Sequence, residues 1–117
     1  MNIDFSEYFD NNELSDVVVE SSDNISKPLH KIVLSNNSII LKNLIDELQN
    51  QYNQKLILNF KWKYLEIIFR YMYTINFSYN YPNTTNHKEI INDFIEILHI
   101  CIHFKLQLNI INIFVRI

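Results

Sequence analysis

Apolar and polar residues alternate most regularly between residues 61 and 74. The apolar positions recur there at steps of three and four: Trp62, Leu65, Ile68, Phe69, Met72 and Tyr73. This spacing predicts an amphipathic helix with a broad apolar face. Residues 90–104 are apolar on almost every side of a helix, which predicts a second helix that is largely buried.

Residues 28–45 predict two short helices joined by a corner. Apolar residues stand at helical spacings on both sides of the polar step Ser-Asn-Asn-Ser at residues 35–38. A Ser or Asn at such a break can accept a hydrogen bond from the free backbone N–H groups of the next helix. Either Asn37 or Ser38 is therefore predicted to start the second helix.

Short apolar runs predict a small sheet of three strands. Residues 17–20 and 25–29 form a hairpin whose turn uses Asp23 and Asn24 in place of Gly, and residues 55–60 form the third strand. Residues 76–88 are expected to be a long loop, since Pro82 and the polar run after it oppose regular structure. Residues 106–117 are expected to close the core as a last helix, although a strand is the alternative.

The composition describes one globular domain. The chain has 117 residues, of which 48% are hydrophobic and 20% charged, so a single core is expected and a second domain has no room. There is no Gly and no Ala, whereas Ile and Asn are abundant, which indicates an AT-rich genome. Without Gly, turns that need a positive φ rely on Asn or Asp.

Charge and hydropathy exclude several function classes. A net charge of −3 argues against a nucleic-acid partner, because phosphate binding needs clustered Lys and Arg. No apolar run approaches the ~20 residues of a membrane span, and the N-terminus lacks the apolar core of a signal peptide. With one cysteine, Cys101, no internal disulfide forms, so an intracellular protein, cytoplasmic or nuclear, is expected.

Candidate chemistry is sparse. His99 and His103 have the i, i+4 spacing of two metal ligands, but Cys101 points about 160° away from both on a helix and no further ligand stands nearby. No Gly-rich phosphate loop or nucleophile motif is present. No metal, cofactor or catalytic residue is therefore predicted. A small metal-dependent enzyme built on His30, His99, Cys101 and His103 is a remote alternative.

Several short motifs occur together in one order. The pattern His-Lys-x-Val-Leu-x-x-x-Ser is formed by His30, Lys31, Val33, Leu34 and Ser38. It follows Ser-Asp-Val at residues 15–17 and precedes Tyr-Met-Tyr-Thr-Ile at residues 71–75. Residues 97–108 carry the spacing Leu-x-x-Ala-x-x-Phe-x-Leu, with Cys101 at the small position. Over about residues 14–116 the chain resembles the BTB/POZ family.

The resemblance implies an α/β (α+β) fold with a three-stranded sheet and five to six flanking helices. Residues 1–13 would be an N-terminal segment with a possible short helix, and residues 14–117 the BTB/POZ-like domain. The implied function is protein association as a homodimer or a larger assembly. The residues expected at the dimer interface are Phe5, Tyr8, Phe9, Asp16, Lys31, Leu41 and Leu44. In relatives, positions matching Asp16 and Lys31 lie near a pocket at the dimer face.

The alternative function is an adaptor or decoy for a cullin-type ubiquitin ligase. In the BTB/POZ relatives that act as such adaptors, a hydrophobic-x-Glu motif lies between the second helix and the third strand. The nearest counterpart in this sequence is Leu48-Gln49-Asn50. Asn50 replaces the acidic residue, which weakens a charge-assisted contact. Potassium-channel tetramerisation domains and elongin C share the fold and are other possible sources of the resemblance.

Overall fold

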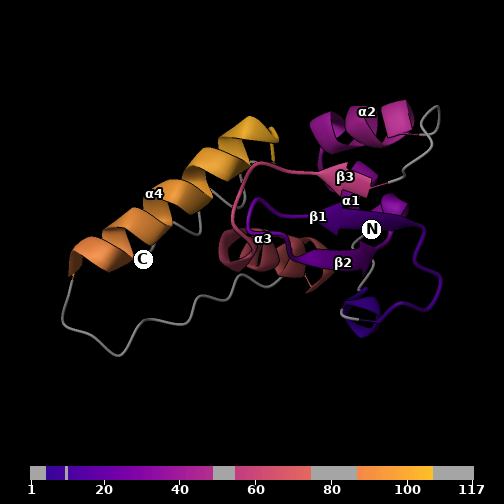
Figure 1. The fold of residues 1–117 in the computed structure, drawn as a ribbon, viewed down its shortest axis with the longest axis horizontal. Coiled ribbons are helices and arrows are strands. Elements are labelled where there is room, and N and C mark those ends of the chain that lie inside the picture. Colours follow the sequence, from indigo (N-terminus) through magenta and orange to yellow (C-terminus); the bar gives the residue numbers. More distant parts are fainter. Residues whose placement is uncertain (1–4, 10, 49–54, 75–86, 107–117) are drawn as a thin grey trace.

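The computed structural model describes residues 5–9, 11–48, 55–74 and 87–106, which form an α/β fold (Figure 1). The elements in chain order are the 3-10 turn η1 (Ser6–Tyr8), β1 (Val17–Glu20), β2 (Ser26–Leu29), α1 (Lys31–Asn37), α2 (Ile39–Leu48), β3 (Lys55–Ile57), α3 (Trp62–Thr74) and α4 (His87–His103). In these ranges four α-helices accompany the sheet, so the expected five to six is too many.

The sheet has the strand order β2-β1-β3. Strand β1 pairs antiparallel with β2, Val17 opposite Leu29, and parallel with β3, Val19 opposite Leu56. A parallel pair needs a crossover connection, which helices α1 and α2 provide. The β-branched Val17 and Val19 both bury their side chains on the same face of β1.

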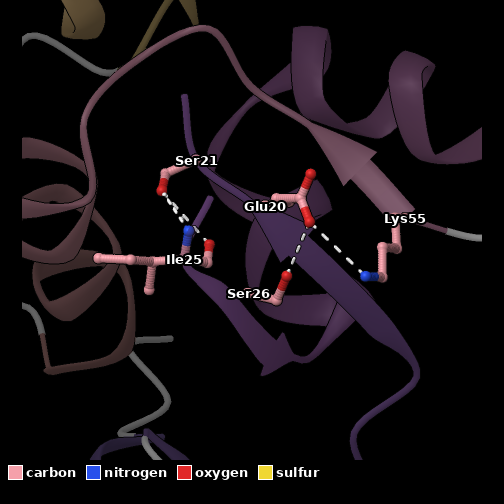
Figure 2. A network of polar contacts seen from close by, with 5 residues as sticks. All are labelled: Glu20, Ser21, Ile25, Ser26 and Lys55. Carbon is pink, nitrogen blue, oxygen red and sulfur yellow. Dashed lines mark hydrogen bonds and ion pairs between the residues drawn. The ribbon is translucent and has the colours of Figure 1, made fainter. Parts of the chain in front are cut away.

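The turn between β1 and β2 confirms that Asn replaces Gly at a demanding position. Asn24 has a φ of 64°, and its backbone N–H donates to the Ser21 carbonyl at 3.0 Å. The buried Ser21 hydroxyl accepts the Ile25 N–H at 3.1 Å, as Figure 2 shows. The turn is thus closed by its own polar groups.

One carboxylate connects all three strands at the surface (Figure 2). Glu20 on β1 accepts a hydrogen bond from Ser26 on β2 at 3.0 Å and lies 3.6 Å from the Lys55 ammonium on β3. Because Lys55 is exposed, water screens this ion pair, and its contribution to stability is small.

Helix α3 confirms the predicted amphipathic helix and provides much of the core. Its residues Leu65, Phe69 and Tyr73 are completely buried. The corner between α1 and α2 also forms as predicted, with Ser38 as the capping residue: its hydroxyl accepts the Leu41 N–H at 3.1 Å. The Asn37 amide donates instead to the Val33 carbonyl, back within α1.

Helix α4 differs from the prediction of burial on nearly every side. Ile97 and Ile100 face the core, whereas Ile91, Ile95 and Ile102 are exposed. The core covers one face only, and the N-terminal half of α4 is the part of the helix farthest from the sheet (Figure 1). The predicted loop at 76–88 lies almost wholly outside the described residues, and so does the predicted last element beyond Leu106.

Candidate protein-interaction surface at the start of helix α1

His30 joins three parts of the chain at the end of β2. Its backbone N–H donates to the Tyr73 hydroxyl at 2.8 Å, and its ring Nδ1 lies 2.8 Å from the same oxygen. Its Nε2 lies 2.7 Å from the Glu13 carbonyl, which can only accept. A neutral ring with its proton on Nε2 satisfies all three contacts, with the Tyr73 hydroxyl donating to Nδ1. Burial raises the pKa of Tyr73, so its hydroxyl keeps its proton.

Asp16 caps helix α1 from a distant position in the sequence. Its Oδ1 accepts the Lys31 N–H at 2.7 Å, while the residue at the cap position, His30, uses no side-chain bond for this purpose. A carboxylate at a helix N-terminus is favoured by the helix dipole and by the free N–H groups there. Together with the Glu13 contact, this bond fixes residues 13–16 against the start of α1.

The N-terminal aromatic residues pack on the chain's own surface. The Phe5 N–H donates to the Tyr73 carbonyl at 2.9 Å, and the Tyr8 ring lies edge-on to His30 at 5.5 Å. Phe9 is buried, 5.2 Å from the Tyr73 ring, with the Arg70 guanidinium 4.6 Å over its face. Phe5 and Tyr8 stay partly exposed beside the start of α1.

Two large apolar side chains are exposed next to the Asp16–Lys31 contact. Leu14 is 75% exposed and has a φ of 60°, which is rare for a side chain with a Cβ. Ile32, the residue after Lys31, is 64% exposed. The hydrogen bonds between Glu13 and His30 and between Asp16 and Lys31 bring the two segments that carry these residues together. We call Leu14, Asp16, Lys31 and Ile32 the α1 surface.

The residues expected at an interface divide into two groups in the structure. Phe9 and Leu41 are buried in the chain's own core, which leaves little or none of their area for a partner. Phe5, Tyr8, Lys31 and Leu44 are partly exposed and Asp16 is exposed. The motif residues Val33, Leu34 and Ser38 are also buried and serve the fold.

Leu14 and Ile32 were not among the expected interface residues. The sequence contains a signal for Ile32, since Ile32, Val33 and Leu34 are consecutive in a helix and lie 100° apart. A helix packed on one side buries two of three such residues, here Val33 and Leu34. The sequence gives no comparable signal for Leu14, because its exposure depends on the contact between Glu13 and His30.

The region expected to contact a cullin is only partly described. Leu48 is the last residue of α2 and is half-buried against the core. Asn50 lies outside the described residues.

His99 and His103 both pack edge-on to one aromatic ring. The Phe60 ring centroid is 6.4 Å from His99 and 5.3 Å from His103, while Cys101 is buried on another side of α4. Within the described ranges, no group of three or more His, Cys, Asp or Glu side chains could hold a metal ion. No helix in these ranges is both long and apolar enough to cross a bilayer.

A polar contact that the sequence did not indicate joins α3 to α4. The Tyr64 hydroxyl donates to Asp93 Oδ1 at 2.9 Å, and the Lys63 ammonium lies 3.4 Å from the same oxygen. Burial, and then the hydrogen bond to Asp93, raise the pKa of Tyr64. The nearly buried carboxylate is thus compensated by both partners.

The fold is that of a small α/β domain, and comparison with known proteins identifies its family. A family model for the BTB/POZ domain matches residues 5–107, so the chain belongs to that family. The solved BTB domain of zebrafish PATZ1 is similar in fold, with a TM-score of 0.64 and 17% sequence identity. That match covers 86% of this chain and 72% of the other. No curated protein sequence matches the chain. BTB/POZ domains are protein–protein interaction modules.

Proposed function

We propose that this BTB/POZ domain associates with a second copy of itself through the α1 surface. The observation that carries the proposal is the conformation of Leu14, which is held in the left-handed region with its side chain in solvent. Placing a non-glycine residue there costs about 1–2 kcal/mol. Within the described chain no burial offsets this cost.

A partner would supply the missing burial. Fully burying a leucine or isoleucine side chain contributes roughly 1.5–3 kcal/mol. Leu14 and Ile32 together would therefore more than offset the strain at Leu14. The hydrogen bonds from Asp16 to Lys31 and from His30 to Glu13 hold both side chains in place before contact, which lowers the entropic cost of binding.

The charges on the α1 surface suit a two-fold contact. In such a contact residue i of one copy meets residue j of the other, and j meets i. Asp16 uses one carboxylate oxygen for Lys31 of its own chain and is exposed, while the Lys31 side chain is partly exposed. Asp16 of each copy can therefore pair with Lys31 of the other, which favours one register of association. Phe5 and Tyr8 extend the same surface.

Gel filtration with light scattering tests the proposal. The full chain at micromolar concentration is expected to have the mass of a dimer or larger assembly, and Ile32→Asp the mass of a monomer. Ile57→Asp is the matched control, since Ile57 on β3 is 69% exposed but lies outside the α1 surface. A monomeric wild-type chain would contradict the proposal, and so would loss of association in the control.

A second proposal is a cullin-type ubiquitin ligase partner. It is supported by the partly exposed Leu48 at the end of α2, the place where the resemblance positions a cullin contact. Asn50 in place of an acidic residue weakens that contact. Asn50→Glu should strengthen capture of a cullin in a pull-down, and no capture by either form would exclude this partner.

A further inference from the structure

The buried ring of His30 makes two hydrogen bonds that respond differently to a second proton. Its Nε2 donates to the Glu13 carbonyl at 2.7 Å from the neutral ring and would donate in the same way from the charged ring. Its Nδ1, 2.8 Å from the Tyr73 hydroxyl, accepts a hydrogen bond from that hydroxyl only while the ring is neutral. A second proton on Nδ1 would place two donors against each other. Protonation is therefore compatible with the Glu13 contact and incompatible with the Tyr73 contact.

The Tyr73 hydroxyl has no second arrangement that suits a charged ring. Its oxygen already accepts the His30 backbone N–H at 2.8 Å, and burial raises the pKa of Tyr73, so the hydroxyl keeps its proton. If Nδ1 also donated to this oxygen, the hydroxyl would have to donate elsewhere, and it makes no further hydrogen bond to the described residues. The Tyr73 side chain is completely buried, and a buried donor without an acceptor is costly. The contact therefore breaks when the ring becomes charged.

Titratable side chains come from every element around this ring. Tyr73 is on α3, Tyr8 on η1 and Lys31 on α1, while Glu13 and Asp16 precede β1. A carboxylate attracts a charged ring and an ammonium repels it, but Asp16 is exposed, so water screens its share. Compared with Asp, Glu, Lys and Tyr, only histidine ordinarily changes its charge between about pH 7.5 and about pH 5.5.

Release of the ring would also relieve the strain at Leu14. The Glu13 carbonyl is held by the His30 ring, and the next residue, Leu14, has a φ of 60°. A ring that leaves its place gives up this contact, and Leu14 can then return to an ordinary φ, which favours the released state. The same movement takes Leu14 from its place on the α1 surface.

We propose that protonation of His30 releases residues 13–16 from the start of α1 and thereby weakens self-association through the α1 surface. The inference rests on the proposed function, since it names a regulation of the same surface. In solvent, a histidine has about ten charged rings for each neutral one at about pH 5.5. Because only the neutral ring supports the associating conformation, the population of that conformation falls several-fold between about pH 7.5 and about pH 5.5.

Sedimentation equilibrium of the full-length chain at about pH 7.5 and about pH 5.5 tests the inference. The wild-type Kd should rise at least about fivefold on acidification. For His30→Gln it should change less than about twofold, because the Gln amide can donate to the Glu13 carbonyl and does not titrate. His99→Gln is the matched control: His99 is exposed on α4, so this variant should keep the full pH dependence. A wild-type Kd that is equal at both pH values, or the same dependence in His30→Gln, would overturn the inference.

Hydrogen exchange of the Lys31 backbone N–H separates this inference from the proposed dimer. Asp16 accepts this N–H at 2.7 Å, so its protection factor reports whether residues 13–16 are docked. In dilute, monomeric protein the protection factor should fall at least about fivefold on acidification in the wild type and stay constant in His30→Gln.

Unchanged protection of the Lys31 N–H in the wild type overturns the inference, whatever the oligomeric state of the chain. If the chain is monomeric at both pH values, the proposed function fails, and the protection of Lys31 alone decides whether His30 controls residues 13–16. Circular dichroism checks that His30→Gln is folded, and the wild-type exchange measurement does not depend on that variant.

Discussion

The molecule exposes apolar side chains at two places that differ in how they are held. On the α1 surface, Leu14 and Ile32 are positioned by hydrogen bonds from Asp16 and His30, and Leu14 has a strained backbone. On the outer face of α4, Ile91, Ile95 and Ile102 are exposed on a regular helix, and none of them has a positive φ. Exposure of an apolar residue can therefore have more than one structural cause.

Strain at an exposed position is maintained only where the surrounding structure imposes it, which favours a role in recognition. Exposed apolar residues at regular helical spacing carry no strain and so give no such indication. The α1 surface, and not the outer face of α4, is therefore the one that we propose contacts a second copy. The predictions that follow test this assignment.

The largest expected effect separates the two surfaces by self-association. Leu14→Asp should raise the Kd at least roughly 100-fold, because it removes apolar contact and places an unpaired carboxylate in the interface. Ile95→Asp, an equivalent change at an exposed position on α4, should leave the Kd within about threefold. Sedimentation equilibrium measures both constants. Similar losses in the two variants would mean that self-association does not depend specifically on the α1 surface.

The next effect concerns the polar support of the α1 surface. Tyr73→Phe removes the hydroxyl that binds His30 and leaves a buried backbone N–H unsatisfied. The free energy of unfolding should fall by about 2 kcal/mol in urea titration. Tyr71→Phe is the matched control: it is also on α3, and its hydroxyl makes no hydrogen bond to the described residues. Equal losses in the two variants would show that the His30 contacts add nothing specific.

The helices and turns also show how far the sequence could predict the fold. Helix α3, the hairpin turn at Asn24 and a cap at Asn37 or Ser38, of which the structure selects Ser38, are predicted correctly, because each depends on spacing and residue type within a few positions. The burial of α4 was wrong, because apolar periodicity shows which residues avoid water but not how many elements are available to cover them. Only the core face, with Ile97 and Ile100, is covered by the described chain.

The candidate site was less predictable than the fold. Residues 13–16 reach the start of α1 through contacts across about 15 positions, and a single sequence does not reveal such pairs. Phe9 and Leu41 were expected at an interface but are buried, since an apolar residue near a motif serves the core as readily as a partner. Leu14 was missed because its exposure and conformation arise only from those distant contacts.

A smaller effect is expected where the corner between α1 and α2 holds the end of α4. Ser38→Ala removes the cap of α2 and the hydrogen bond to the Phe104 carbonyl. The free energy of unfolding should fall by about 1.5 kcal/mol, as for a lost helix cap and a buried hydrogen bond. Ser35→Ala, on the neighbouring α1, is the control and should change it by less than about 0.5 kcal/mol. Urea titrations in which both variants match the wild type would exclude Ser38 as an anchor.

The strain at Leu14 predicts opposite effects on folding and on association. Leu14→Asn should raise the free energy of unfolding of the dilute protein by about 0.5–1 kcal/mol, because Asn tolerates the left-handed region better than Leu. The same change should weaken self-association, since an apolar contact is lost. Calorimetry at low concentration and light scattering at high concentration measure the two effects. If Leu14→Asn lowers both the free energy of unfolding and the extent of self-association, the conformation of Leu14 is not a strain that binding of a partner offsets.

The smallest expected effect is a pH dependence from a carboxylate that belongs to neither surface. Hydrogen bonds from the Ser21 hydroxyl and the Trp62 N–H lower the pKa of Asp23 below its ordinary value of 3.8. Because the folded pKa is the lower one, the stabilisation is present above pH 3.8 and is lost as the pH falls through the folded pKa. Asp23→Asn should thus reduce the loss of stability between pH 5 and pH 3, while Asp46→Asn, an exposed change on α2, should not. If Asp23→Asn leaves the acid dependence unchanged, the hydrogen bond from the Trp62 N–H to Asp23 contributes nothing to stability. If the acid dependence falls as expected, any acid effect that remains can be sought at the α1 surface.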